Sequence, residues 1–176
     1  MRVLAVSGSL RKASHNTALL RAMAEEAPEG VTFTLFDGLE AVPPFNEDRE
    51  DHPQPPGLAR WRNALRTADL VVFATPEYNT TIPGQLKNAV DWASRPFGEE
   101  SVLWGRPVAV LGASKTGYGA MWSQADLRKA LAKAGARVLD AELAIPYAHR
   151  VTGDVLRRRA GGYLADVLDA VKVPAR

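Results

Sequence analysis

The sequence of 176 residues contains no cysteine, no long apolar run and little net charge. Without cysteine the chain cannot form disulfides, iron–sulfur clusters, thiolate catalytic sites or cysteine zinc sites. No apolar run approaches the ~20 residues that a membrane-spanning helix requires. The chain starts with a short strand-like run rather than the longer apolar segment of a signal peptide. We therefore expect a cytoplasmic protein with no membrane partner.

The net charge at pH 7 is only +2, from 22 basic and 20 acidic residues. A balance so close to neutral gives no reason to expect a nucleic-acid partner. The triplet Arg157-Arg158-Arg159 concentrates positive charge locally, and we interpret it as a solvated helix face rather than a nucleic-acid patch. The three histidines, at positions 15, 52 and 149, lack the spacing of a metal site or a catalytic triad.

Short apolar runs alternate with helical patterns along the chain, as in βαβ units around a parallel sheet. Strands are predicted at 2–7, 31–36, 70–74, 108–111 and 137–139, and helices at 16–27, 57–68, 83–94, 122–134 and 154–172. A long segment rich in proline, glycine and acids, 37–56, separates the second strand from the second helix. No repeat or linker divides the chain, so we predict one α/β domain over residues 1–176, with an open doubly wound sheet. Trp61 is expected in its core.

The turn after the first strand carries several groups suited to an anion. It reads Gly8-Ser9-Leu10-Arg11-Lys12-Ala13-Ser14-His15-Asn16 and leads into a predicted helix. The free N–H groups and the dipole of a helix N-terminus favour an anion. Arg11 adds a fork of donors suited to phosphate. The alternative is a plain strand-to-helix turn in which Ser14 only caps the helix. We favour the anion site, although neither common glycine-rich nucleotide motif occurs.

Two further loops should lie beside this turn, because ligands in such folds bind beyond the C-terminal strand ends. After the third strand comes Thr75-Pro76-Glu77-Tyr78-Asn79-Thr80-Thr81-Ile82-Pro83-Gly84, where two prolines restrict the backbone. A preorganised loop of this kind suits a flat ring system. After the fourth strand comes Gly112-Ala113-Ser114-Lys115-Thr116-Gly117-Tyr118-Gly119-Ala120. A ring attached to a phosphate on the first turn would lie between these two loops.

These motifs resemble those of the NADPH-dependent FMN reductase family, which includes azo-, quinone- and chromate-reducing flavoproteins. The resemblance rests on the Gly8–Asn16 turn, on Pro76-Glu77-Tyr78-Asn79 followed by Pro83-Gly84-Gln85-Leu86-Lys87-Asn88-Ala89-Val90-Asp91-Trp92, and on the Gly112–Ala120 loop. It extends from residue 2 to about residue 140. It implies a flavodoxin-like α/β fold with five parallel strands in the order 2-1-3-4-5 and helices on both faces. The first turn differs from the T-x-T-G-x-T turn of flavodoxin electron carriers.

The resemblance also implies three groups of FMN-binding residues. The phosphate would be held by Ser9, Arg11, Ser14 and Asn16. His15, next to them, is either a surface residue like the other two histidines or a supporting cofactor-binding residue of the phosphate loop. The isoalloxazine ring would lie against Pro76, Glu77, Tyr78 and Asn79, with Asn79 near its reactive edge. Its other side would be bordered by Ser114, Lys115, Thr116 and Gly117.

The implied chemistry is a ping-pong cycle carried by the flavin. NADPH or NADH would pass a hydride to flavin N5, and the reduced flavin would then pass two electrons to a small-molecule acceptor. No catalytic side chain is needed. Relatives form homodimers or homotetramers, so we expect the 37–56 segment and the helix after Pro83 to meet a partner subunit. Lys87 and Asp91, four residues apart, form either a helix-surface ion pair or a subunit contact.

Two other functions are kept as alternatives to the oxidoreductase. One is a flavodoxin-type electron carrier, but carriers usually present an acidic face, whereas this chain has an isoelectric point near 9.0. The other is a doubly wound module that binds a nucleotide or another phosphate ligand without flavin. The sequence does not separate NADPH from NADH as the electron donor, nor does it name the acceptor.

Overall fold

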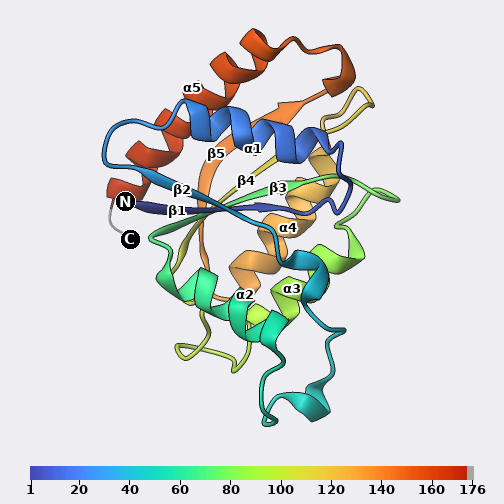
Figure 1. The fold of residues 1–176 in the computed structure, drawn as a ribbon, viewed down its shortest axis with the longest axis vertical. Coiled ribbons are helices and arrows are strands. Elements are labelled where there is room, and N and C mark those ends of the chain that lie inside the picture. Colours follow the sequence, from blue (N-terminus) through green and yellow to red (C-terminus); the bar gives the residue numbers. More distant parts are fainter. Residues whose placement is uncertain (174–176) are drawn as a thin grey trace.

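The computed structural model describes residues 1–173 and shows a single parallel sheet between two layers of helices (Figure 1). The sheet order is β2-β1-β3-β4-β5. The strands are β1 (Arg2–Ser7), β2 (Thr32–Phe36), β3 (Leu70–Thr75), β4 (Pro107–Ala113) and β5 (Arg137–Ile145). The helices are α1 (His15–Glu25), α2 (Pro56–Thr67), α3 (Gly84–Ala93), α4 (Met121–Lys133) and α5 (Gly153–Lys172). The predicted fold class and strand order are confirmed.

Helices cover both faces of the sheet. α1 and α5 pack together on the upper face in Figure 1, and α2, α3 and α4 cover the other. The strand residues alternate between the two layers. Those facing α2, α3 and α4 include Leu4, Val6, Val71 and Phe73, and those facing α1 and α5 include Val3, Ala5, Leu70 and Val72. Both sets are apolar, as strands covered on both faces require.

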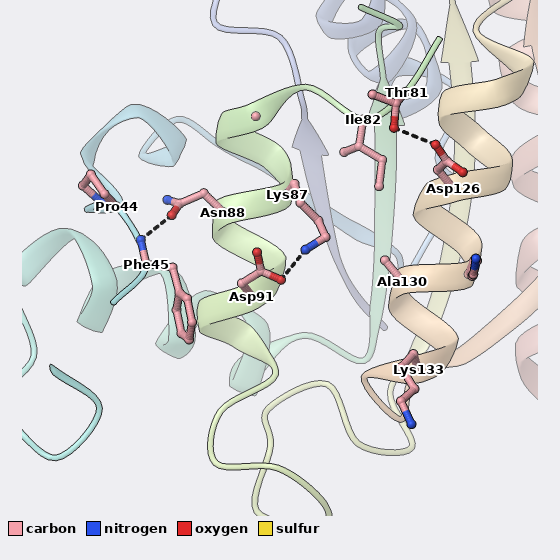
Figure 2. Close-up of a pocket in the computed structure, with 12 residues that line it drawn as sticks. Pro44, Phe45, Thr81, Ile82, Lys87, Asn88, Asp91, Asp126, Ala130 and Lys133 are labelled. Atoms are coloured by element: carbon pink, nitrogen blue, oxygen red, sulfur yellow. Dashed lines mark hydrogen bonds and ion pairs between the residues drawn. The ribbon is translucent and has the colours of Figure 1, made fainter. Parts of the chain in front are cut away.

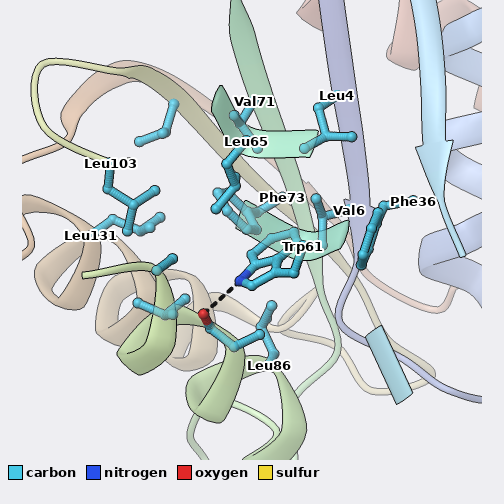
Figure 3. Close-up of a cluster of buried hydrophobic side chains, with 14 of the residues drawn as sticks. Leu4, Val6, Phe36, Trp61, Leu65, Val71, Phe73, Leu86, Leu103 and Leu131 are labelled. Carbon is cyan, nitrogen blue, oxygen red and sulfur yellow. Dashed lines mark hydrogen bonds between the residues drawn. The ribbon is translucent and has the colours of Figure 1, made fainter. Parts of the chain in front are cut away.

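Trp61 of α2 lies in the core between the sheet and α3 (Figure 3). It is fully buried, and its ring centroid lies 5.0 Å from that of Phe36 and 6.5 Å from that of Phe73. Its Nε1 donates a hydrogen bond of 2.8 Å to the carbonyl of Ala89 in α3. The buried indole N–H therefore has the partner that it needs. The core position predicted for Trp61 is confirmed.

The segment 37–56 packs against α3 and is fixed to it by hydrogen bonds. It contains two short 3₁₀ turns, η1 (Leu39–Ala41) and η2 (Glu47–Arg49). Gln85 Nε2 donates to the carbonyl of Leu39 at 2.7 Å, and Asn88 Oδ1 accepts the N–H of Phe45 at 2.6 Å. Side chains of α3 thus satisfy backbone groups that a loop without regular structure would otherwise expose.

The prediction for the fifth strand is wrong in length. It ended at Leu139, whereas β5 continues to Ile145 and a third 3₁₀ turn, η3 (Ala148–Arg150), follows. β5 lies at the edge of the sheet, and Asp140 and Glu142 are exposed there. These two acids interrupt the apolar run on which the prediction relied. The other predicted elements begin and end within two residues of the observed ones.

The pairing of β5 with β4 is irregular. Its register shifts between Val108 and Val110. Arg128 of α4 donates to the carbonyls of Leu139 and Val110 at 2.7 and 3.2 Å, and the Tyr163 hydroxyl of α5 donates to Val110 at 3.0 Å. Burial raises the pKa of Tyr163, which keeps its hydroxyl protonated as a donor. Side chains from both helical layers therefore hold the bulged pairing together.

Candidate cofactor site at the C-terminal edge of the sheet

A cavity of about 240 Å³ opens where the loops after β1, β3 and β4 meet. It lies where the strand order reverses between β1 and β3, the place where open α/β sheets bind ligands. Its lining consists of Ser9, Arg11, Ser14, His15, Asn16, Pro76, Glu77, Tyr78, Ala113, Ser114, Lys115 and Thr116. The structure thus brings together all the predicted site residues except Asn79 and Gly117. Ala113 is the one lining residue that was not predicted.

The turn between β1 and α1 presents donors to this cavity. Ser14 is the N-cap of α1, and its side chain accepts the N–H of Thr17 at 3.2 Å. The capping role that the sequence left as an alternative is therefore present. Ser14 both caps α1 and lines the cavity. The N–H groups of His15 and Asn16, in the first turn, have no helical acceptor because of their position. Arg11 Nη2 donates to the carbonyl of Ala13 at 2.9 Å, which leaves other guanidinium N–H groups for a ligand.

Asn16 joins α1 to β4 through its side chain. Its Nδ2 donates to the carbonyl of Ala113 at 3.0 Å, and its Oδ1 accepts the N–H of Ala113 at 2.9 Å. The residue is only 2% exposed. Since both amide atoms are engaged, its backbone N–H rather than its side chain is the group that remains for a phosphate, and the predicted phosphate contact stays a prediction.

Positive charge gathers around His15. Burial lowers the pKa of His15, and the neighbouring charges of Lys115, Arg11 and His149 lower it further. Arg11 and Lys115 therefore bring positive charge to this end of the cavity, whereas Glu77, which also lines it, has its Oε2 engaged with the start of α4. An anion placed among Arg11, Lys115 and the helix N-terminus would be stabilised by all of them. This donor set fits the phosphate group that the sequence predicted.

Glu77 reaches across the site to the start of α4. Its Oε2 accepts the N–H groups of Trp122 and Ser123 at 3.0 and 3.2 Å. α4 has no capping side chain of its own, because Ala120 stands at its N-cap position in the left-handed conformation, with φ 64°. The carboxylate of Glu77 therefore caps α4 from a different loop. Nothing local in the sequence signals this pairing.

The loop after β3 makes a tight turn at the mouth of the cavity. The N–H of Thr81 donates to the carbonyl of Tyr78 at 3.1 Å, and the reverse bond measures 3.3 Å. Asn79 and Thr80, at the tip, have φ values of 51° and 61°. This conformation is unusual for a β-branched residue such as Thr80, and strain of this kind gathers at ligand sites. Thr81 Oγ1 ties the turn to α4 through Asp126 at 2.6 Å.

The segment after β5, which sequence reasoning missed, supports the loop after β4. The N–H of Ser114 donates to the carbonyl of Ile145 at 3.1 Å, and the N–H of Tyr147 donates to Thr116 at 3.0 Å. A Cβ atom on Gly117 would lie 2.9 Å from the Tyr147 hydroxyl, so Gly117 packs against Tyr147 outside the cavity lining. The sequence does hold one signal for this segment. The apolar run that ends at Ile145 is followed by Pro146, which is typical of the end of a strand.

A larger groove of about 840 Å³ runs between α3 and α4 and shares no lining residue with the cavity (Figure 2). Lys87 Nζ lies 2.6 Å from Asp91 Oδ1, so the helix-surface ion pair, one of the two alternatives from the sequence, is present. The subunit contact stays a prediction. Apolar groups from Phe45, Ile82 and Ala130 line the groove together with charged side chains. Phe45 belongs to the 37–56 segment, which thus borders this groove.

The described residues also bear on the questions of membrane-spanning helices, metal-binding clusters and the environment of the arginine triplet. Across residues 1–173, no helix is both long and apolar enough for a membrane span, and no cluster of histidine and acidic side chains is arranged to hold a metal ion. Arg157 forms an ion pair with Asp154, and Arg159 donates to the carbonyl of Ala144 at 2.9 Å.

Comparison with known proteins supplies the family. Residues 1–150 match the sequence model of the family described as NADPH-dependent FMN reductase. An NAD(P)H-dependent FMN reductase of Pseudomonas aeruginosa is 44% identical over 131 residues, which cover 74% of this chain and 69% of that protein. A quinone reductase of Pseudomonas putida is 40% identical over 129 residues, which cover 73% of this chain and 68% of that protein.

A solved structure agrees with these relatives. The flavoenzyme NAD(P)H:(acceptor) oxidoreductase FerB of Paracoccus denitrificans has a TM-score of 0.81 and 28% sequence identity, over 96% of this chain and 97% of that one. The residues matched by the family include all three loops that form the cavity. The chain therefore belongs to the NADPH-dependent FMN reductase family, as its loop motifs predicted.

Proposed function

We propose that the protein is an NAD(P)H-dependent oxidoreductase that binds FMN in the cavity between the loops after β1, β3 and β4, and reduces quinones or similar small acceptors. Family membership supports the activity. The single observation that carries the binding site is the convergence of the Arg11 turn with the other two loops on one cavity. A generic phosphate cradle would need only the first of these loops.

The turn between β1 and α1 holds the phosphate end. Arg11 and Lys115 supply charge, the Ser9 hydroxyl supplies a further donor, and the first turn of α1 supplies backbone N–H groups. Asn16 sets the spacing, because its two bonds to Ala113 hold the start of α1 against the end of β4. These bonds fix the position of the Gly8–Asn16 turn relative to the loop after β4.

The loops after β3 and β4 hold the ring end. FMN, when bound, supplies the acceptance of a hydride from NAD(P)H and its delivery to a second substrate. The protein contributes orientation, through the turn at Tyr78 and the Ser114–Gly117 loop. A ring held between these loops would lie beside Tyr78, which is 49% exposed, at the surface of the protein. Tyr78, Tyr118 and Trp122 are each more than 40% exposed and provide aromatic surface for a flat substrate on this side.

The test is an anaerobic spectroscopic titration of the purified protein. We expect bound or added FMN to give a flavin spectrum, NADPH or NADH to bleach it, and a benzoquinone to restore it. Steady-state rates should give the parallel reciprocal plots of a ping-pong cycle. A protein that binds no FMN would overturn the proposal. Flavin binding without oxidation of either nicotinamide cofactor would instead favour an electron carrier.

We also propose that a second copy of the chain docks on the groove between α3 and α4. The lining carries both signs of charge, because Lys129 and Lys133 come from α4 and Asp91 from α3. Ile82 and Ala130 add apolar surface, with Ala130 on the α4 side of the groove (Figure 2). Mixed charges over apolar surface suit a twofold interface, in which each patch meets its own copy. The 37–56 segment and α3, predicted to meet a partner, both border this groove.

Sedimentation of the holoprotein tests the dimer. The wild type should sediment as a dimer or a tetramer, and Ala130→Arg should dissociate it, because the new charge would be buried in the interface without a partner. Ala18→Arg on the exposed face of α1 is the matched control and should leave the assembly intact. A wild-type monomer at micromolar concentration, or an Ala130→Arg variant that assembles normally, would refute this interface.

A further inference from the structure

The turn after β5, residues 145–150, packs against the loop after β4. The carbonyl of Ser114 accepts the N–H of Ala148 at 2.8 Å, and the carbonyl of Thr116 accepts the N–H of Tyr147 at 3.0 Å. The cavity lining includes Ser114 and Thr116 but, within the described chain, no residue of this turn. The loop therefore lies between the cavity and the turn after β5.

These two bonds fix the direction in which the loop presents its N–H groups. In a trans peptide the C=O group and the following N–H group point in opposite directions. The carbonyls of Ser114 and Thr116 point toward the turn after β5. The N–H groups of Lys115 and Gly117 therefore point the other way, toward the side on which the cavity lies. Donors fixed in advance beside a ligand stabilise negative charge on it without further reorganisation.

Tyr147 supports this loop with its ring as well as with its backbone. A Cβ atom on Gly117 would lie 2.9 Å from the Tyr147 hydroxyl oxygen and 3.3 Å from the ring carbon that carries it, so the ring contacts Gly117. The guanidinium of Arg150 lies 5.4 Å from the centre of the same ring. Tyr147 has φ 48° and ψ 40°, a left-handed conformation that is costly for a bulky residue and persists only where its surroundings hold it.

We propose that Tyr147 is a positioning residue for FMN. By supporting Gly117 it keeps the N–H groups of Lys115 and Gly117 directed at the ring, and so sets the affinity and the reduction potential of bound FMN from outside the cavity. The inference rests on the proposed FMN site, and it adds a fourth segment to the three loops that line this site. Reduction adds negative charge to the ring, so these donors stabilise reduced FMN more than oxidised FMN.

The variant Tyr147→Asn tests this role, because asparagine tolerates the left-handed conformation but has no ring to support Gly117. We expect the dissociation constant of FMN to rise about fivefold, the effect of one net hydrogen bond. Reduced FMN should lose about fivefold more affinity than oxidised FMN, which lowers the two-electron midpoint potential by about 20 mV. Tyr147→Phe keeps the ring and should restore both values. Phe97→Asn, at an exposed aromatic between α3 and β4, is the matched control and should change neither.

Hydrogen exchange of the flavin-free protein gives a readout that needs no ligand. The amides of Ser114 and Ala148, which join the loop to the turn after β5, should exchange faster in Tyr147→Asn than in the wild type. The amides of β4 within the sheet should keep their protection, which shows that the variant is folded.

Three results would overturn the inference. Unchanged exchange, affinity and potential in Tyr147→Asn would overturn it while the FMN site stands. Weaker affinity with an unchanged midpoint potential would also overturn it, because Tyr147 would then support the loop without directing its N–H groups. A wild-type protein that binds no FMN would overturn the proposed function and this inference together.

Discussion

The Oε2 atom of Glu77 accepts the backbone N–H of Trp122 at 3.0 Å and so joins the loop after β3 to the first turn of α4. The hydroxyls of Thr75 and Ser123, 2.7 Å apart and buried, connect the same two elements one step deeper. Polar side chains thus hold the loop after β3 against the first turn of α4. The position of the loop after β3 depends on a helix that begins more than 40 residues later.

Removing this cap should destabilise the protein. We expect Glu77→Ala to lower the free energy of unfolding by about 1–2 kcal/mol, as the loss of an N-cap does. Glu77→Gln keeps an acceptor oxygen and loses only the interaction of charge with the helix dipole, about 0.5 kcal/mol. Urea denaturation measures both. The exposed Glu29→Ala serves as the control, and equal stability of all three variants would contradict the capping role.

Asn16→Ala should lower the free energy of unfolding by more than Glu77→Ala, which removes the cap of α4. It leaves both backbone groups of Ala113 without a partner in a buried position, and unsatisfied buried groups cost about 1–3 kcal/mol. We expect a loss of about 2–3 kcal/mol in the free energy of unfolding, together with weaker FMN binding because α1 and β4 separate. Asn63→Ala, at an exposed position on α2, is the comparison. Weaker FMN binding with unchanged stability would instead mean that the Asn16 side chain contacts the phosphate itself.

The stability of the flavin-free protein should fall as the pH drops below 6.5. The pKa of His15 in the folded protein lies below its ordinary value of 6.5, because burial and the charges of Lys115, Arg11 and His149 oppose protonation. Between 6.5 and that lowered pKa, the unfolded chain binds more protons than the folded one, so stability decreases as pH decreases through this window.

Denaturation curves at several pH values check this prediction. The decline in the free energy of unfolding from pH 7 to pH 5.5 should be smaller in His15→Asn than in the wild type. His52→Asn, which changes an exposed histidine in the 37–56 segment, should retain the full decline. A steeper decline in His15→Asn than in the wild type would mean that the pKa of His15 is raised on folding instead.

Much of the fold could be predicted because it depends on local pattern. The runs Val3–Val6 and Leu70–Ala74 are apolar throughout, which identifies strands buried on both faces. β5 was predicted too short because Asp140 and Glu142 break that pattern at an edge strand. The donors that make its irregular pairing tolerable, Arg128 and Tyr163, come from two helices on either side of it in the sequence.

The candidate site was predicted in composition but not in its internal bonding. Motif spacing located the cavity-lining residues of the three loops, since those loops follow adjacent strands. The bonds from Glu77 to α4 and from Asn16 to Ala113 join residues 45 or more positions apart. Such pairings depend on how the helices pack on the sheet, and no pattern within one segment contains that information. The same applies to the segment at Tyr147, which supports the loop after β4.

The measurement that tests the central claim most directly is the dissociation constant of FMN for Arg11→Ala beside that of the wild type, followed by quenching of flavin fluorescence on the apoprotein. Arg11 is exposed, and its side chain donates to the carbonyl of Ala13 within its own turn, so the free energy of unfolding should change little. We predict a loss of about 1.5–3 kcal/mol in FMN binding, the contribution of a hydrogen bond to a charged group. Unchanged FMN affinity in Arg11→Ala would contradict the placement of the flavin phosphate on the Gly8–Asn16 turn.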